Sequence, residues 1–318
     1  MDSRETKRTV PVPSVGADGE QPISQTPTAS ITEETTENNP PEKNYAELLR
    51  KMQRMNDPAY LPTISMNELY ENVYQSRPPV IDGLLYPGTY LFAGAPKVGK
   101  SFLMAQLAYH VSMGLPLWDY PVHKGTVLYL ALEDDHRRLQ ERLYRMFGMD
   151  GTNDLLFSIC AKQVGNGLEE QLKRFVQEHP DTKLIIIDTL QKIREAGGDK
   201  YSYANDYEVV GKLKRLADAC GVCLLLVHHT RKQQADDKFD MISGTNGLSG
   251  AADGAFLLQK EKRTDGTATL DVVGRDQQDQ RLYLIKDKEH LTWTLERMET
   301  ELWVEPPDPV LELSLIHI

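Results

Sequence analysis

Apolar and polar residues follow two different periods through the middle of the chain. Short apolar runs of strand length occupy Tyr90–Ala93, Thr126–Leu132, Leu184–Asp188 and Val222–Val227. Apolar residues at helical spacing between these runs predict helices over Ser101–Met113, Asp134–Phe147, Leu168–Glu178 and Asp206–Ala219. Because strands alternating with helices are typical of a sheet covered by helices, we expect an α/β fold with a mainly parallel central sheet.

The pattern changes after the glycine-rich stretch "SGTNGLSGAADG". Shorter apolar runs follow at Ala255–Gln259, Thr267–Val273 and Arg281–Lys286, with Gly and Asp residues between them. Glycine and aspartate between short strands are typical of hairpin turns. We therefore expect antiparallel hairpins at the C-terminal side of the parallel sheet.

The N-terminal part of the chain differs in composition from the middle. Residues 1–43 are rich in Pro, Thr, Ser and Glu and nearly free of large apolar residues, which predicts a disordered tail. Residues 44–80 are expected to form a short helical linker, because 44–56 carries apolar residues at helical spacing. This helix has two candidate partners, its own domain and a neighbouring subunit. The main domain is expected over residues 81–298.

The C-terminal end gives a separate expectation. Residues 299–312 are expected to be the start of a truncated C-terminal segment. The sequence of 313–318, "LSLIHI", resembles the translation of an adapter used in sequencing libraries, the alternative being a short apolar end. On the adapter interpretation, 313–318 carry no function and the natural C-terminus is missing.

Charge and cysteine content narrow the class of protein. The chain has 318 residues and a formal net charge of −11, which argues against a surface coated in basic charge for gripping nucleic acid. A local basic loop inside a ring remains compatible with this balance. Its 3 cysteines cannot all pair, which indicates a reducing compartment. No apolar run reaches membrane-spanning length and no signal core follows the N-terminus, so we expect a cytoplasmic protein without a membrane partner.

The pair Cys220-x-x-Cys223 resembles a redox or half-zinc motif. It straddles the end of a predicted helix and the start of a predicted strand, with no second pair of ligands in the sequence. We therefore interpret both cysteines as small core residues.

The stretch "GAPKVGKS" has the phosphate-loop pattern, and it lies between an apolar strand and an apolar-faced helix, which is the context that this motif requires. Lys100 should reach the β- and γ-phosphates of a nucleotide, and Ser101 should bind Mg²⁺. The alternative is a glycine-rich turn with a coincidental GKS. The expected nucleotide-binding residues are Gly94, Ala95, Pro96, Lys97, Val98, Gly99, Lys100, Ser101 and Phe102.

Two carboxylates follow predicted strands. Asp188 ends the apolar run "LIIID" and should hold Mg²⁺, the alternative being a turn-capping aspartate. Thr189 follows it, so the residue that activates the attacking water has to come from elsewhere. Glu133 in "ALEDD" is the candidate, with a helix cap as the alternative. Asp134 and Asp135 fit better as acids at a helix start.

The stretch "LVHHTRK" brings His228 and His229 to the same edge of the predicted sheet. Adjacent strand residues point to opposite faces, so we expect one of the two to face the γ-phosphate. The alternative is a pair of strand-end histidines bonded to backbone or water. The same geometry argues against a metal site formed by the pair. The polar loop 231–247 follows, as a DNA contact or a solvated loop.

Together these motifs resemble the core of RecA-type ATPases over roughly residues 80–290. The motif sequences "ALEDD", "LIIIDTL" and "LVHHTRK" are most similar to those of RepA-type hexameric replicative helicases of plasmids and of related AAA-family ATPases of phages and mobile elements. The resemblance implies a hexameric ring with ATP and Mg²⁺ between neighbouring subunits. It also implies an arginine supplied by the next subunit, for which Arg275 is the best match and Arg281 the second. The alternative for Arg275 is an ordinary hairpin arginine.

The resemblance further implies that loop 231–247 grips single-stranded DNA in the ring channel, and that a replication initiator or primase is a partner. The acidic "DDKFD" within that loop departs from the positive charge that such a channel requires. We therefore expect a replicative-helicase-like, DNA-dependent ATPase, with a non-motor RecA-type switch as the alternative. A small-molecule kinase shares the loop but does not explain Glu133 together with "VHHTRK".

Overall fold

The computed structural model describes residues 42–73, 77–194, 203–230, 239, 247–262, 264–275 and 277–300. The expected tail (apart from Glu42 and Lys43, which begin the first helix), nearly all of loop 231–247 and the segments beyond residue 300 lie outside these residues. The chain divides into two units, Met1–Val73 and Tyr74–Ile318.

The described part of the first unit is helical. The helix predicted over 44–56 is confirmed as α1 (Glu42–Met55), whose apolar side chains Tyr45 and Met52 are exposed. A second helix, α2 (Met66–Glu71), was not predicted. Ser65 and Glu68 cap its first turn reciprocally, so the S-x-x-E spacing was the signal for it.

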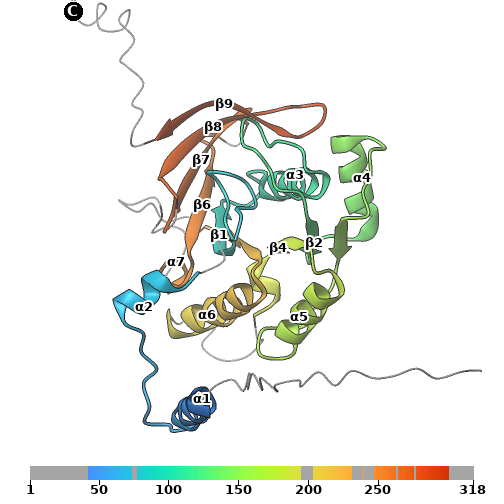
Figure 1. Cartoon of the computed structure of the whole chain (residues 1–318). Helices are drawn as coiled ribbons and strands as arrows, with labels where there is room; N and C mark the ends of the chain where they lie inside the picture. Colours follow the sequence, from blue (N-terminus) through green and yellow to red (C-terminus); the bar gives the residue numbers. More distant parts are fainter. Residues whose placement is uncertain are drawn as a thin grey trace, which may run out of the picture. The chain divides into compact units, whose positions relative to one another are not determined.

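The second unit contains one sheet of nine strands, in the order β3-β2-β4-β5-β1-β6-β7-β8-β9 (Figure 1). The six strands from β3 to β6 in that order run parallel, and β7, β8 and β9 continue the sheet antiparallel. This confirms the α/β class and the C-terminal hairpins. The strands are β1 (Gly88–Gly94), β2 (Thr126–Ala131), β3 (Leu155–Ser158), β4 (Thr182–Asp188), β5 (Cys223–His229), β6 (Gly254–Gln259), β7 (Thr267–Gly274), β8 (Gln280–Lys286) and β9 (Trp293–Thr300).

Helices cover both faces of this sheet (Figure 1). One hydrophobic core joins the sheet to α3 (Lys100–Met113) and α4 (His136–Phe147). A second core lies on the other face, under α5 (Leu168–Glu178), α6 (Tyr203–Cys220) and the short α7 (Gly247–Ala251). A single-turn 3₁₀ helix, η1 (Leu190–Lys192), follows β4. With apolar partners on both sides, the central strands read as continuous apolar runs.

The parallel register brings the carboxyl ends of the central strands to one edge. Gly94 at the end of β1 lies beside His229 of β5 and Leu258 of β6. Asp188 at the end of β4 lies beside Ala131 at the end of β2. Ligands bind at this edge in open α/β sheets, so the fold places the predicted site residues around one point.

Two strands of the sheet, β3 and β9, were not predicted from the sequence. β3 is a short edge strand whose residues are all half-buried, so its pattern is weak. β9 had a clearer signal, because Leu291, Trp293 and Leu295 alternate at the spacing of a strand. The Trp293 side chain is fully buried, and it proves important for the phosphate loop.

The cysteines lie where the motif analysis placed them. Cys220 ends α6 and is half-buried, and Cys223 begins β5 and is fully buried, with Gly221 between them at φ +72. Within the described residues no cluster of His, Cys, Asp or Glu is arranged to hold a metal ion. In the same residues, no helix has the length and apolar character needed to cross a membrane.

Candidate nucleotide site

The phosphate loop joins β1 to α3 through backbone that glycine alone fits comfortably. A Cβ at Gly94 would stand 2.6 Å from the carbonyl oxygen of Leu258. Gly99 has φ +112, and a Cβ there would stand 2.8 Å from the Trp293 ring. The β9 tryptophan therefore supports the loop from behind, which explains why the second glycine is needed at this position.

The Lys100 side chain lies along the phosphate loop. Its ammonium donates to the carbonyl oxygens of Gly94 at 2.7 Å and Ala95 at 3.1 Å, and to Nδ1 of His229 at 2.9 Å. Burial lowers the pKa of Lys100 to about 8, and the charges of Asp188 and Glu133 oppose this shift. Phosphate oxygens can replace these acceptors, so the lysine is already placed at the mouth of the loop.

The remaining loop residues divide into two groups. The side chain of Val98 is buried in the core, so it supports the loop and makes no contact with a ligand through its side chain. The others that line the cavity beside the loop are Pro96, Lys97, Gly99, Ser101 and Phe102. Lys97 has a positive φ of 65, an uncommon backbone for a residue with a side chain.

Asp188 is held by hydrogen bonds at the end of β4. The Tyr129 hydroxyl, fully buried on β2, donates to Asp188 Oδ2 at 2.9 Å, and the Ser101 hydroxyl bonds to the same carboxyl group. Burial raises the pKa of Asp188, and the hydrogen bonds from Ser101 and Tyr129 partly offset this. The role of Tyr129 was missed because a tyrosine inside an apolar strand looks like an ordinary core residue.

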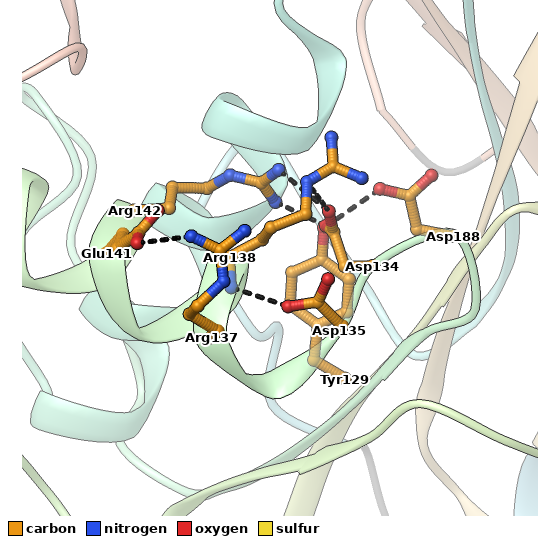
Figure 2. A network of polar contacts seen from close by, with 8 residues as sticks. All are labelled: Tyr129, Asp134, Asp135, Arg137, Arg138, Glu141, Arg142 and Asp188. Atoms are coloured by element: carbon orange, nitrogen blue, oxygen red, sulfur yellow. Dashed lines mark hydrogen bonds and ion pairs between the residues drawn. The ribbon is translucent and has the colours of Figure 1, made fainter.

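The loop after β2 presents Glu133 to the cavity. Its neighbour Asp134 accepts two hydrogen bonds from the Arg142 guanidinium, at 2.7 and 3.1 Å, and both side chains are largely buried (Figure 2). The Leu132 N–H also donates to the carbonyl oxygen of Asp188 at 2.8 Å. These contacts fix the backbone on both sides of Glu133.

The prediction for the two following acids needs correction. Asp135 does cap α4, accepting from the Arg138 N–H at 2.8 Å (Figure 2). Asp134 instead accepts from Arg142. The chain turns just before α4, and the Asp134 carboxylate therefore lies beside α4, where it meets the Arg142 guanidinium. Among the described carboxylates of the cavity, Glu133 is the one without a hydrogen bond or ion pair to the protein, which suits a group that acts on water.

The two histidines lie within β5, whose end is at His229 and not at Val227 as predicted. His229 contacts Lys100 and lines the cavity, and His228 belongs to the opposite face by strand alternation. Burial and the charge of Lys100 lower the pKa of His229. When Nδ1 of a neutral His229 accepts from Lys100, the ring proton is on Nε2, and that N–H is the group that can donate to a phosphate oxygen.

The predicted arginines lie away from this cavity. Arg275 follows β7, where its N–H donates to the carbonyl oxygen of Asp253 just before β6. Since β6 runs parallel to β1, this is the opposite edge of the sheet from the phosphate loop. The Arg275 side chain is 61% exposed, with one guanidinium nitrogen 3.8 Å from Asp253 Oδ1. Arg281 pairs with Asp271 at 2.5 Å on the sheet surface.

The cavity beside the loop has a volume of about 500 Å³, which is within the range of nucleotide and cofactor sites. Its donor set fits a phosphate and a hard cation. Lys100 and the N-terminus of α3 suit phosphate oxygens, and the Ser101 hydroxyl and Asp188 carboxylate are oxygen ligands of the kind that Mg²⁺ takes.

Comparison with known proteins agrees with this geometry. The AAA domain family matches residues 55–235, more than half of the chain. The chain belongs to the AAA domain family. With its loop, sheet order and carboxylates, this AAA protein is a RecA-type P-loop ATPase that binds and hydrolyses ATP, and the resemblance seen in the sequence is confirmed at that level.

Solved structures share the fold of this AAA ATPase. The ATPase domain of G40P covers 81% of this chain and 99% of its own, at 15% identity and a TM-score of 0.56. A DnaB-like replicative helicase, described with its interactions with primase, covers 79% of this chain and 71% of its own, at 16% identity and a TM-score of 0.56. No curated protein sequence matches the chain.

Proposed function

We propose that this ATPase is a Mg²⁺-dependent, DNA-stimulated motor of the replicative-helicase type, acting in the cytoplasm as a hexameric ring for a mobile element. The observation that carries the proposal is the division of the site between two edges of one sheet. One edge holds Lys100, Asp188 and Glu133, and the opposite edge presents the exposed Arg275. Arg138 and Arg142 of the same subunit also line the cavity, but both interact with Asp134, so we assign the stabilisation of transition-state charge to Arg275 of a neighbouring subunit.

The position of Arg275 favours a ring or a filament over a monomer. An arginine at the far edge cannot reach the nucleotide of its own subunit, but subunits in a head-to-tail arrangement bring one edge against the next. The apolar side chains of Tyr45, Leu49 and Met52, exposed on α1, offer a further face for assembly. The DnaB-like replicative helicase with this fold supports the motor, and the primase named with it supports a primase or an initiator as the partner.

Single-stranded DNA is expected to stimulate ATP hydrolysis. ATPase rates are measured with Mg²⁺ and saturating ATP, with and without a single-stranded oligonucleotide, and the Lys100→Ala variant serves as the control for contaminating activity. A motor whose ATP hydrolysis is coupled to DNA hydrolyses ATP slowly without DNA. We therefore expect DNA to raise the ATPase rate at least about tenfold, which corresponds to about 1.4 kcal/mol in the activation barrier. An assembled protein whose ATPase rate is the same with and without DNA would contradict the motor hypothesis and favour a RecA-type ATPase switch.

Substitution of the proposed trans arginine has a distinct signature. Arg275→Ala is expected to leave ATP binding within about twofold and to lower turnover by about 10³-fold, the contribution of an arginine finger. Mixed with Lys100→Ala subunits, it should regain activity, because the second variant supplies an intact arginine to an intact phosphate loop. Turnover of the mixtures is measured at a fixed total concentration.

Arg281→Ala is the matched comparison for Arg275→Ala. Arg281 is tied to Asp271 on the sheet, so its loss is expected to change turnover little. If Arg281→Ala loses turnover and is rescued by mixing, while Arg275→Ala remains active, the second arginine is the one that acts in trans.

A further inference from the structure

Lys286 is a cation of the nucleotide cavity that the motifs did not reveal. It ends β8, which runs in the same direction as β1, so its side chain reaches the edge that holds the phosphate loop. The ammonium lies 4.0 Å from the centre of the Phe102 ring and 5.7 Å from the Trp293 ring. It lines the same cavity as Lys100 and Ser101.

Two other cations lie near Lys286. Burial and the charges of Lys260 and Arg145 lower the pKa of Lys286. The Arg142 guanidinium lies over the same Phe102 ring, 5.3 Å from its centre, but its charge is paired with Asp134. The adjoining first turn of α3 adds the positive end of a helix dipole. Within the described residues no carboxylate forms an ion pair with Lys286.

Aromatic rings alone do not account for this arrangement. A half-buried lysine above Phe102 gains from the cation–π contact, but it would gain the same contact without facing Lys260, Arg145 and a helix start. An anion in the cavity would relieve the repulsion. Phe102 follows Ser101 in the first turn of α3, where the backbone of a phosphate loop cradles the α- and β-phosphates, whereas Lys100 is expected to reach the β- and γ-phosphates.

We propose that Lys286 binds the α-phosphate of the nucleotide, on the side of the loop away from the attacking water. This inference rests on the nucleotide site described above and adds a residue to it. Lys100 serves the β- and γ-phosphates, and Lys286 serves the phosphate next to the sugar. The β8–β9 hairpin, which carries Lys286 and the loop-supporting Trp293, thereby joins ligand binding to the antiparallel part of the sheet.

The test compares nucleotides with a ligand that has no α-phosphate. Lys286→Met keeps an apolar stem over Phe102 and removes the charge. We expect its dissociation constants for ADP and for a non-hydrolysable ATP analogue to rise about tenfold, as for loss of one charge-assisted hydrogen bond at a partly exposed site. Binding of pyrophosphate, which occupies the β and γ positions, should change less than about twofold. All constants are measured by titration calorimetry.

Lys173→Met is the control. Lys173 is exposed on α5, which packs on the other face of the sheet from α3, and it does not line the nucleotide cavity. We expect it to leave all three constants within about twofold, since no ligand contact is removed. Lys286→Arg, which restores the charge, should recover most of the nucleotide affinity.

Two results would overturn the assignment. Unchanged nucleotide affinity in a folded Lys286→Met protein would reduce Lys286 to a structural cation. An equal loss for pyrophosphate and ADP would place its action on the β-phosphate or on the loop itself. Neither result bears on the motor hypothesis, which is tested by DNA stimulation of the ATPase rate. A protein that binds ATP but is not stimulated by DNA can still confirm the role of Lys286 in nucleotide binding.

Discussion

Replacing Lys100 by alanine is expected to remove nucleotide binding at ordinary concentrations. The lysine is the cation at the centre of the site, and each charge-assisted hydrogen bond that it makes with the phosphates contributes about 1.5–3 kcal/mol. Loss of its contacts to two phosphates therefore weakens binding by at least about 100-fold. Binding is measured by calorimetry with a non-hydrolysable ATP analogue and Mg²⁺. Unchanged affinity and turnover would remove the loop from the mechanism.

The lowered pKa of Lys100 predicts how the free energy of unfolding changes with pH. Its pKa falls from the ordinary 10.5 to about 8 on folding, so between these values the unfolded chain binds more protons than the native protein. Wild-type stability therefore gains from this group as pH rises from about 8 to 10.5, by about 3 kcal/mol at most. Lys100→Ala lacks this gain.

The measurement is the free energy of unfolding in urea for both proteins at several pH values. The other titrating groups are common to both, so the difference between the two curves isolates Lys100. A difference that stays constant from pH 8 to 10.5 would mean that the native lysine titrates as it does in water.

Glu133→Gln is expected to separate ATP binding from ATP hydrolysis. Glutamine keeps the size of the side chain but cannot take a proton from water. Turnover should fall by about 10²–10⁴-fold, the usual contribution of a general base. Affinity for ATP should stay within about threefold, because the phosphate contacts belong to Lys100 and the loop. Both are followed in one preparation, by steady-state rates and by calorimetry.

The neighbouring acid is the natural control for Glu133. Asp134→Asn weakens the contact with Arg142 and loosens the loop, which predicts a smaller loss of turnover together with a lower melting temperature. If Asp134→Asn abolishes hydrolysis in a stable protein and Glu133→Gln does not, then the base is Asp134. The contact between Asp134 and Arg142 would then have to open during the cycle.

Much of this site could be predicted from the sequence, because its motifs consist of residues close together in the chain. The glycines, Lys100 and Ser101 lie within a few residues, and Asp188 ends an apolar run that could hardly be anything but a buried strand. Strand period and helix period are properties of short windows, so the alternating strands and helices of the α/β core also followed from the pattern. In the fold, the sequence did not predict the short helices α2 and α7, the strands β3 and β9 or some element boundaries, and in the site it did not predict the pairing of Asp134 with Arg142.

The sequence by itself determined the class of fold, the phosphate loop and the identity of its carboxylates, since each depends on residues near one another in the chain. Only the tertiary structure decided which side chains surround them. Tyr129 on Asp188, Arg142 on Asp134, Trp293 behind Gly99 and Lys286 above Phe102 are contacts between separate elements. No local period records such pairs, because they arise when strand order and register bring distant segments to one edge of the sheet. The same register placed Arg275 at the other edge of the sheet, away from the nucleotide cavity of its own subunit.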